Sequence, residues 1–327
     1  MRRREFVSLL AGVVACRPEV AHAQHAVMPV VGVIGSGSPA VYAERLTLIR
    51  RGLEETGFTE SRTVAIEYRW AEGQLDRLPS LANELVVRDV NVVVATGGLQ
   101  AVHAAMTATN TIPIVFSTDG DPVRQGLVSN LNRPSGNATG ITVFSASLTA
   151  KRLEIFRQIV PKTKIIGVLI NLTAEQAAQQ TRDAEEAARS LGLETHVLEV
   201  RSDLDFDQVL GDFSKLTDVA LLVSADPIFI AGRGKLIATA NRHRIPAIYG
   251  RREFATAGGL ASYGANLEEP YRLMGTYVGR VLKGEKVANL PVAQPTKFEF
   301  VINSKTAKAL GITISPSLLA LADEVIE

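Results

Sequence analysis

The fold of this chain is decided at residues 111–126, TIPIVFSTDGDPVRQG. Residues 112–116 are apolar and partly β-branched, which predicts a buried strand. The chain becomes polar within one residue at Ser117 and then passes through Pro122 into a segment that can be helical. A buried strand followed by a short polar loop and a helix is the repeating unit of a parallel sheet. Ligands of such sheets bind beyond the carboxyl ends of the strands, so this polar loop is a candidate binding element.

Residues 219–230, VALLVSADPIFI, repeat this pattern in the second half of the chain. We therefore expect two polar loops that face each other across a cleft. Further strands are expected at residues 30–34, 64–68, 90–95, 141–144, 165–170, 194–200, 245–249, 259–263 and 298–302. Helices are expected in most of the intervening segments, including a short one completed at 126–131, and none is assigned to residues 250–258. This alternation predicts an α/β fold with two doubly wound parallel sheets.

The length of 327 residues suits roughly two domains. Glycine, proline and asparagine gather near residues 136–140, 264–266 and 290–295, which predicts three crossings between two lobes and hence a three-segment hinge. The expected N-terminal lobe comprises residues 28–140 plus 266–290. The expected C-terminal lobe comprises residues 141–265 plus 291–327.

The N-terminus has the pattern of an export signal, assigned to residues 1–23. A basic start with paired arginines precedes a short apolar run, and Ala21-His22-Ala23 forms a small-x-small cleavage site. The arginines resemble a twin-arginine signal, so the mature chain is expected in the periplasm. Cys16 is the only cysteine and lies in this segment. Residues 13–16, VVAC, also resemble a lipoprotein cleavage site, which leaves lipid anchoring at Cys16 as the alternative.

Composition excludes several classes of partner. The chain is 46% hydrophobic and 21% charged, with a net charge of +1. Because there is no long run of charge, neither nucleic acid nor an anionic membrane surface is an expected partner.

An enzyme remains an alternative because of the turn Gly35-x-Gly37-x-x-Ala40, which follows a strand as in dinucleotide-binding proteins. The acidic residue expected about 20 residues on is missing, since Glu67 lies 30 residues beyond Gly37. A tight turn capped by Ser38 explains the same pattern. The alternative enzyme would be an exported NAD(P)-dependent oxidoreductase. The scattered histidines have no metal-ligand spacing, and we expect no catalytic residue, metal or cofactor.

Polar residues recur at the ends of the expected strands and suit a small polar or zwitterionic ligand. Helix N-termini can hold a carboxylate, and a buried aspartate can hold an ammonium group. The candidate ligand-binding residues are Ser36, Ser38, Thr96, Gly97, Thr118, Asp119, Asp121, Asn171, Asp226, Tyr249 and Glu253.

Structural roles compete with binding at several of these positions. Asp121-Pro122 and Asp226-Pro227 each have the form of a helix cap followed by a first-turn proline, so capping is an alternative role for both aspartates. Asp119 has no such role. Trp70, the only tryptophan, could pack in the core or form a stacking wall for a ligand.

The chain resembles the extracytoplasmic substrate-binding proteins of ABC transporters, in the family that includes tryptophan-binding lipoproteins, with a fold similar to type I periplasmic binding proteins. The matching stretches include NVVVATGGLQA, IPIVFSTDGDPVRQGLVSNLNRPSGNATGIT, SADPIF, GGLASYG and PTKFEFVINSKTAKALGI. The resemblance implies ligand capture between two lobes and delivery to an ABC permease in the inner membrane, and a monomer is expected. It implies binding roles for the strand-end residues named above.

One departure affects the expected ligand. Tryptophan-binding members are similar to Thr-Asp-Asn at the second-lobe loop, where this chain has Ala225-Asp226-Pro227. The aspartate is retained and its amide neighbour is replaced, which argues against an aromatic amino acid. A sensory receptor of the same fold is the remaining alternative function.

Overall fold

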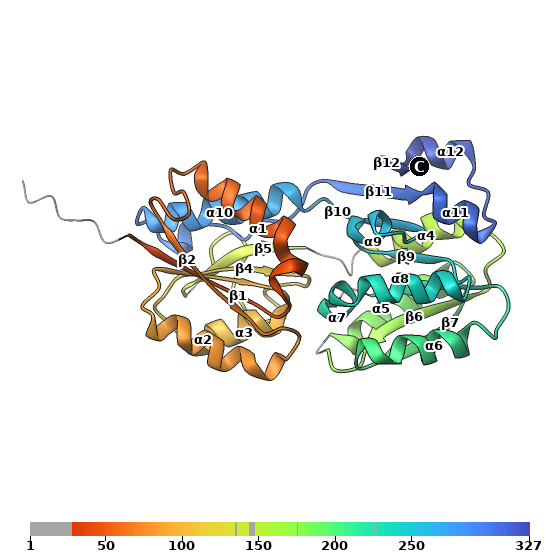
Figure 1. Cartoon of the computed structure of the whole chain (residues 1–327), viewed down its shortest axis with the longest axis horizontal. Coiled ribbons are helices and arrows are strands. Elements are labelled where there is room, and N and C mark those ends of the chain that lie inside the picture. Colours follow the sequence, from red (N-terminus) through yellow and green to blue (C-terminus); the bar gives the residue numbers. More distant parts are fainter. Residues whose placement is uncertain (1–27, 135, 144–147, 175, 225) are drawn as a thin grey trace, which may run out of the picture.

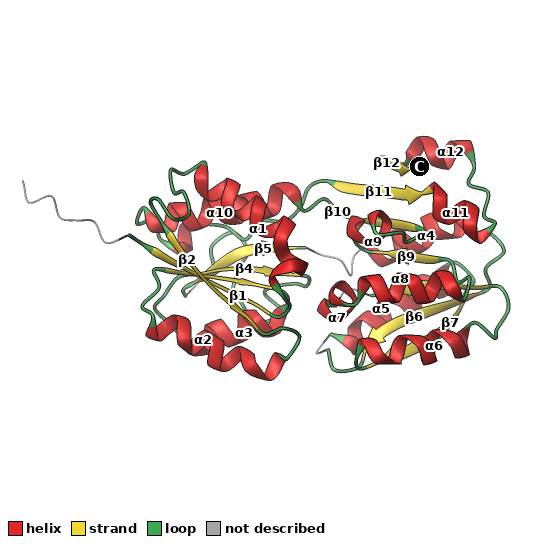
Figure 2. Cartoon of the chain, in the orientation of Figure 1, coloured by secondary structure: helices red, strands yellow, loops and turns green. Residues whose placement is uncertain are grey.

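The computed structural model describes residues 28–134, 136–143, 148–174, 176–224 and 226–327. The predicted signal peptide and Cys16 lie outside the described residues. The chain forms two lobes side by side, each built from a sheet with helices on both faces (Figures 1 and 2). This confirms the predicted class of two α/β lobes.

The N-terminal sheet has the strand order β2-β1-β3-β4-β5, and its strand pairs are parallel. Its strands are β1 (Val30–Gly35), β2 (Ala65–Trp70), β3 (Val92–Thr96), β4 (Ile114–Thr118) and β5 (Ala138–Thr142). Its helical elements are α1 (Pro39–Glu54), η1 (Leu75–Arg77), α2 (Leu78–Val87), α3 (Leu99–Ala108), α10 (Glu268–Leu282) and η4 (Val287–Asn289). Helices α2 and α3 cover one face, and α1 and α10 cover the other (Figure 1). Strands β3 and β4 are buried along their whole length, as their unbroken apolar runs predict.

The C-terminal sheet has the order β12-β11-β10-β9-β8-β6-β7. Its strands are β6 (Ile165–Asn171), β7 (Glu194–Val200), β8 (Val219–Val223), β9 (Ala247–Tyr249), β10 (Ala261–Ala265), β11 (Phe298–Asn303) and β12 (Glu324–Ile326). Its helical elements are α4 (Thr149–Ile159), α5 (Ala177–Ser190), η3 (Asp203–Asp205), α6 (Phe206–Phe213), α7 (Pro227–Ala231), α8 (Arg233–Arg242), α9 (Arg252–Thr256), α11 (Ser304–Leu310) and α12 (Pro316–Leu321).

One strand pair of this sheet is antiparallel: β11 runs opposite to β10, with Tyr263 opposite Phe300. The reason is the path of the chain. Strand β10 leads out toward the N-terminal lobe, and β11 returns from that lobe into the same sheet (Figure 1). Strand β12 and helix α9 are short elements that the sequence pattern did not predict.

Three segments connect the lobes, between β5 and α4, between β10 and α10, and between η4 and β11. They are bonded to one another. The Thr142 N–H donates to the Ala293 carbonyl at 2.9 Å, and the Ala293 N–H donates to the Gly140 carbonyl at 2.9 Å. The Asn266 N–H donates to the Lys297 carbonyl at 3.0 Å. The crossings therefore form a connected hinge.

The predicted helix at 126–131 is wrong, because residues 122–133 form turns and bends. The segment starts as predicted, with Asp121 accepting backbone N–H groups. Gly126 then adopts φ +71°, a left-handed conformation that ends the turn.

Candidate ligand-binding cleft

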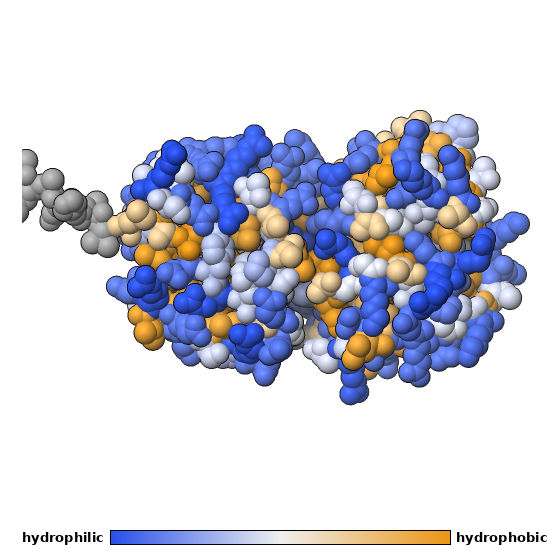
Figure 3. Space-filling view, in the orientation of Figure 1, coloured by the Kyte–Doolittle hydropathy of each residue, from blue (hydrophilic) through white to orange (hydrophobic). Residues whose placement is uncertain are grey.

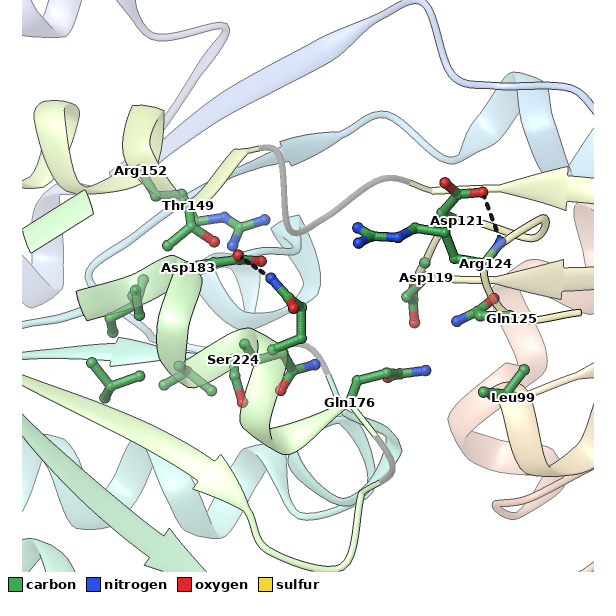
Figure 4. Close-up of a pocket in the computed structure, with 17 residues that line it drawn as sticks. Leu99, Asp119, Asp121, Arg124, Gln125, Thr149, Arg152, Gln176, Asp183 and Ser224 are labelled. Carbon is green, nitrogen blue, oxygen red and sulfur yellow. Dashed lines mark hydrogen bonds between the residues drawn. The ribbon is translucent and has the colours of Figure 1, made fainter. Parts of the chain in front are cut away.

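A cavity of about 470 Å³ lies between the two lobes, within the range of roughly 300–1,000 Å³ usual for small-molecule sites. The molecular surface is hollowed along this boundary (Figure 3). The loop after β4 forms the N-terminal wall, and α4, the start of α5 and the end of β8 form the C-terminal wall. Arg124 and Arg152 extend into the cavity from opposite sides (Figure 4). The polar loop of the opening stretch is thus part of a cleft wall.

Asp119 lies at this boundary and pairs with Arg251 of the other lobe, with 2.5 Å between Oδ1 and Nη2. Its side chain is 21% exposed, and that of Arg251 is 10% exposed. A charged hydrogen bond this well shielded from water is stronger than a surface ion pair. Asp119 therefore contributes to holding the lobes together as well as lining the cavity.

The rest of this loop is shaped by its own hydrogen bonds. Asp121 Oδ1 accepts the N–H groups of Val123 at 2.9 Å and Arg124 at 3.3 Å, which is the capping role considered as the alternative. Thr118 Oγ1 donates to Gln125 Oε1 at 2.8 Å. Asp121 also lines the cavity, whereas Thr118 lines a narrow gap beside it.

Asn171 and Asp226 form a buried pair on the C-terminal lobe. Asn171 Nδ2 donates to Asp226 Oδ1 at 3.0 Å, and the same oxygen accepts the Ile228 N–H at 2.9 Å, so Asp226 caps α7. Burial raises the pKa of Asp226 to about 6, and the charge of Asp119 adds to this rise, against the lowering effect of both hydrogen bonds. The group is therefore a carboxyl that loses its proton near neutral pH.

The predicted residues of the β1 and β3 loops mainly hold those loops to each other. The Ser36 hydroxyl donates to the Gly97 carbonyl, and Thr96 Oγ1 lies 3.2 Å from Ser117 Oγ. Gly97 has φ +91°, and a Cβ there would lie 2.6 Å from Ser36 Oγ, so only glycine fits. Ser38 is half-buried ahead of α1. Of the four predicted residues Ser36, Ser38, Thr96 and Gly97, only Gly97 lines a narrow gap between the lobes.

Tyr249 and Glu253 lie away from the main cavity. Tyr249 is buried in the C-terminal core and stacks on Phe254 at 4.7 Å between ring centroids. Glu253 pairs across the lobes with Arg45, with 3.4 Å between Oε1 and Nη2. Burial alone would raise the pKa of Glu253, but the charges of Arg45 and Arg251 hold it below its usual value. Glu253 is thus an ionised contact between the lobes.

The glycines of the dinucleotide-like turn have a packing explanation. A Cβ on Gly35 would lie 2.2 Å from the Trp70 ring, and one on Gly37 would lie 2.8 Å from the Tyr42 ring. Trp70 stacks between Tyr42 and Tyr68, with distances between ring centroids of 5.4 Å to Tyr42 and 6.4 Å to Tyr68. These glycines make room for an aromatic stack inside the lobe, which is the packing role considered for Trp70.

Three arginines at the lobe boundary were not among the residues predicted from the sequence: Arg124, Arg152 and Arg251. Arg152 is only 3% exposed, and its Nε donates to the Tyr263 carbonyl at 2.8 Å. Burial and the nearby charge of Arg251 together lower the pKa of Arg152 to about 10. Arg251 could have been identified by its position after the end of β9, because Tyr249 and Glu253 were predicted as site residues from the same loop. Arg152 sits on a helix beside its apolar face, and no local pattern marks it.

The fold and cleft define a two-lobed binding protein, and comparison with known proteins agrees. Residues 31–326 match the family described as ABC transporter substrate binding protein. The chain belongs to this family.

Individual relatives share about a quarter of their residues with this chain. The chain is 28% identical over 262 residues to a tyrosine-binding protein of Clostridioides difficile (strain R20291), covering 80% of this chain and 75% of the relative. It is similar to the crystal structure of an ABC domain in complex with L-Trp from Streptococcus pneumonia, with TM-score 0.83, 26% identity, and coverage of 91% and 99% of the two chains. A conserved domain protein from Vibrio cholerae has the same fold, with TM-score 0.84, 24% identity, and coverage of 91% and 99%.

Proposed function

We propose that this chain is the extracytoplasmic solute-binding component of an ABC import system and captures a small amino-acid-like ligand between its lobes. The observation that carries the proposal is a cavity bounded by both lobes beside a bonded three-segment hinge. A ligand that contacts both walls at once binds the closed form better than the open form, and this difference drives hinge closure.

The charges of the cavity support an amino-acid-like ligand. Asp119, Asp121 and Asp183 supply carboxylates, and Arg124 and Arg152 supply guanidinium groups. Groups of both signs on facing walls suit a zwitterion, because each charge of the ligand can find an opposite partner away from water. The relatives named for binding tyrosine and L-Trp support the same class of ligand.

The proposed system has three further parts. The N-terminal signal directs export to the periplasm, an inner-membrane permease receives the ligand, and the protein acts as a monomer without covalent chemistry. No helix in the described part of the chain is long and apolar enough to cross a membrane.

A thermal-shift screen of amino acids, small carboxylic acids and nucleosides tests this function. We expect at least one amino acid or small carboxylic acid to raise Tm, because a ligand at 100 times its Kd adds about 2.7 kcal/mol to the free energy of unfolding. Asp119→Ala should abolish most of the shift. The matched control is Asp212→Ala, which removes an exposed carboxylate that pairs with Lys215 just beyond the end of α6, away from the cavity. A panel in which no amino acid or small carboxylic acid raises Tm contradicts the proposal, and a shift caused by NAD(P) would favour the oxidoreductase alternative.

A further inference from the structure

A narrow niche lies beside the main cavity and is lined mainly by the C-terminal lobe. Its volume is about 20 Å³, room for one water-sized group. It shares Arg152, Val223 and Ser224 with the cavity, and its other polar lining residues include Arg251 and Asp226. The niche and the main cavity therefore share part of one wall.

Two buried groups at the niche lack hydrogen-bond partners among the described residues. One is Nη1 of Arg251, a residue only 9% exposed, and the other is Oγ of Ser224. Arg251 uses its Nη2 on Asp119, which leaves Nη1 as a charged N–H group out of contact with both water and protein acceptors. Because buried donors without partners are rare and costly, the geometry calls for an acceptor in the niche.

The charge around the niche gives the same indication. A Cβ built on Gly250 would lie 3.1 Å from Nη2 of Arg152, so the Arg152 guanidinium lies against the backbone just before Arg251. Two buried cations in one region repel each other. Asp119 already pairs with Arg251 and also acts on Arg152, the charge of Arg251 acts on Glu253, and Asp226, whose pKa burial raises, lines the same niche. An anion between the arginines would relieve the repulsion.

We propose that this niche binds a carboxylate oxygen of the ligand, with Arg251 Nη1 and Ser224 Oγ as donors and Arg152 as the second cation. The carboxylate carbon and the rest of the ligand occupy the main cavity. The inference rests on the proposed function and narrows it: the ligand is an amino acid or other small carboxylic acid bound through its acid group by the C-terminal lobe.

The test compares each carboxylic acid with its own carboxamide. The probes are L-tyrosine with L-tyrosinamide, L-tryptophan with L-tryptophanamide, and the acids found in the thermal-shift screen with their amides. Titration calorimetry gives Kd for both members of a pair. We expect the acid to bind roughly 10- to 100-fold more tightly than the amide, the range typical of one hydrogen bond to a charged group.

Three variants separate recognition of the carboxylate from closure of the lobes. Arg251→Gln should reduce the acid-to-amide ratio of affinities to near one. Asp119→Asn removes the same ion pair but retains the guanidinium, so it should weaken acid and amide by the same factor and preserve the ratio. Arg252→Gln is the matched control, because that guanidinium pairs with Glu324 away from the cavity. Equal Tm values for ligand-free Arg251→Gln and Arg252→Gln show that the site variant is folded.

The outcomes are distinct. An amide that binds as tightly as its acid, or a preserved ratio in Arg251→Gln, overturns the inference and leaves the proposed function standing. If the Tm of Arg251→Gln lies far below that of the control, Ser224→Ala replaces it as the test. Ser224→Ala should reduce the acid-to-amide ratio of affinities by about tenfold. An unchanged ratio in that variant overturns the inference. If no acid in the panel binds, both the proposed function and the inference fail.

Discussion

At the scale of single residues, the polar groups of the cleft serve several roles at once. Asp226 caps α7, accepts a hydrogen bond from Asn171 and lines the niche. Asp119 faces the cavity and holds Arg251. Strand-end position identified both aspartates, because the sequence shows where a buried strand becomes polar. The sequence did not identify Arg152, because the pattern around a buried arginine on an amphipathic helix differs little from the pattern around an arginine that extends into solvent.

Asp226 should make stability depend on pH. Its folded pKa of about 6 lies above the ordinary aspartate pKa of 3.8, so the folded state binds the proton more tightly than the unfolded state. The stabilising effect of this proton is complete below the unfolded pKa and is lost as pH rises through about 6. The loss amounts to about 3 kcal/mol in the free energy of unfolding.

Asp226→Asn measures this contribution, because asparagine keeps an acceptor for capping but cannot ionise. Urea unfolding of both proteins between pH 4 and pH 7 gives the comparison. We expect the wild type to lose stability relative to Asp226→Asn as pH rises. Two parallel profiles would show that Asp226 does not titrate in this range.

At the scale of elements, α1 and α10 pack so closely that glycines are required at their contact. A Cβ on Gly275 would lie 1.9 Å from the carbonyl oxygen of Ile49, and one on Gly52 would lie 1.8 Å from that of Arg272. This contact joins segments more than 200 residues apart and places Arg45 of α1 opposite the C-terminal lobe. The sequence predicts both helices but gives no indication that they touch.

Gly275→Ala should therefore lower the free energy of unfolding by about 1–3 kcal/mol, because the added methyl group meets backbone rather than a flexible side chain. The control is Gly234→Ala in α8, where a Cβ has no neighbour within 4 Å. It should be neutral or stabilising by up to about 1 kcal/mol through higher helix propensity. Chemical denaturation of both variants gives the values, and similar stabilities would contradict the close packing of α1 on α10.

At the scale of the whole molecule, ion pairs that join the lobes include Arg45–Glu253 and Asp119–Arg251. Arg45 is buried, with its guanidinium 5.1 Å from the Tyr42 ring centroid and 5.5 Å from that of Tyr271. Only one side of this cation faces the other lobe. Its pairing with Glu253 therefore depends on the lobes being close together, and the pair favours the closed arrangement.

Glu253→Gln should shift the protein toward the open form. We expect a larger radius of gyration of the ligand-free protein in small-angle scattering and a roughly fivefold weaker affinity for any ligand found in the screen, equivalent to about 1 kcal/mol. Glu55→Gln is the control, because it breaks an ion pair with Arg272 inside the N-terminal lobe. If both variants scatter and bind alike, the interlobe pair does not govern closure.

The sequence by itself determined the strands other than β12, the two-lobe α/β class and the polar loops after β4 and β8. These depend on local apolar runs and on the turn chemistry that ends them, which neighbouring residues record. The tertiary structure decided the rest: that Arg251 meets Asp119, that Arg152 lies beside both, that β11 returns antiparallel, and that Ser36, Thr96 and Tyr249 point away from the cavity. Such relations join residues far apart in the chain, 132 positions in the pair between Asp119 and Arg251. They follow from how two sheets are set around a hinge, and no local pattern in the chain carries that information.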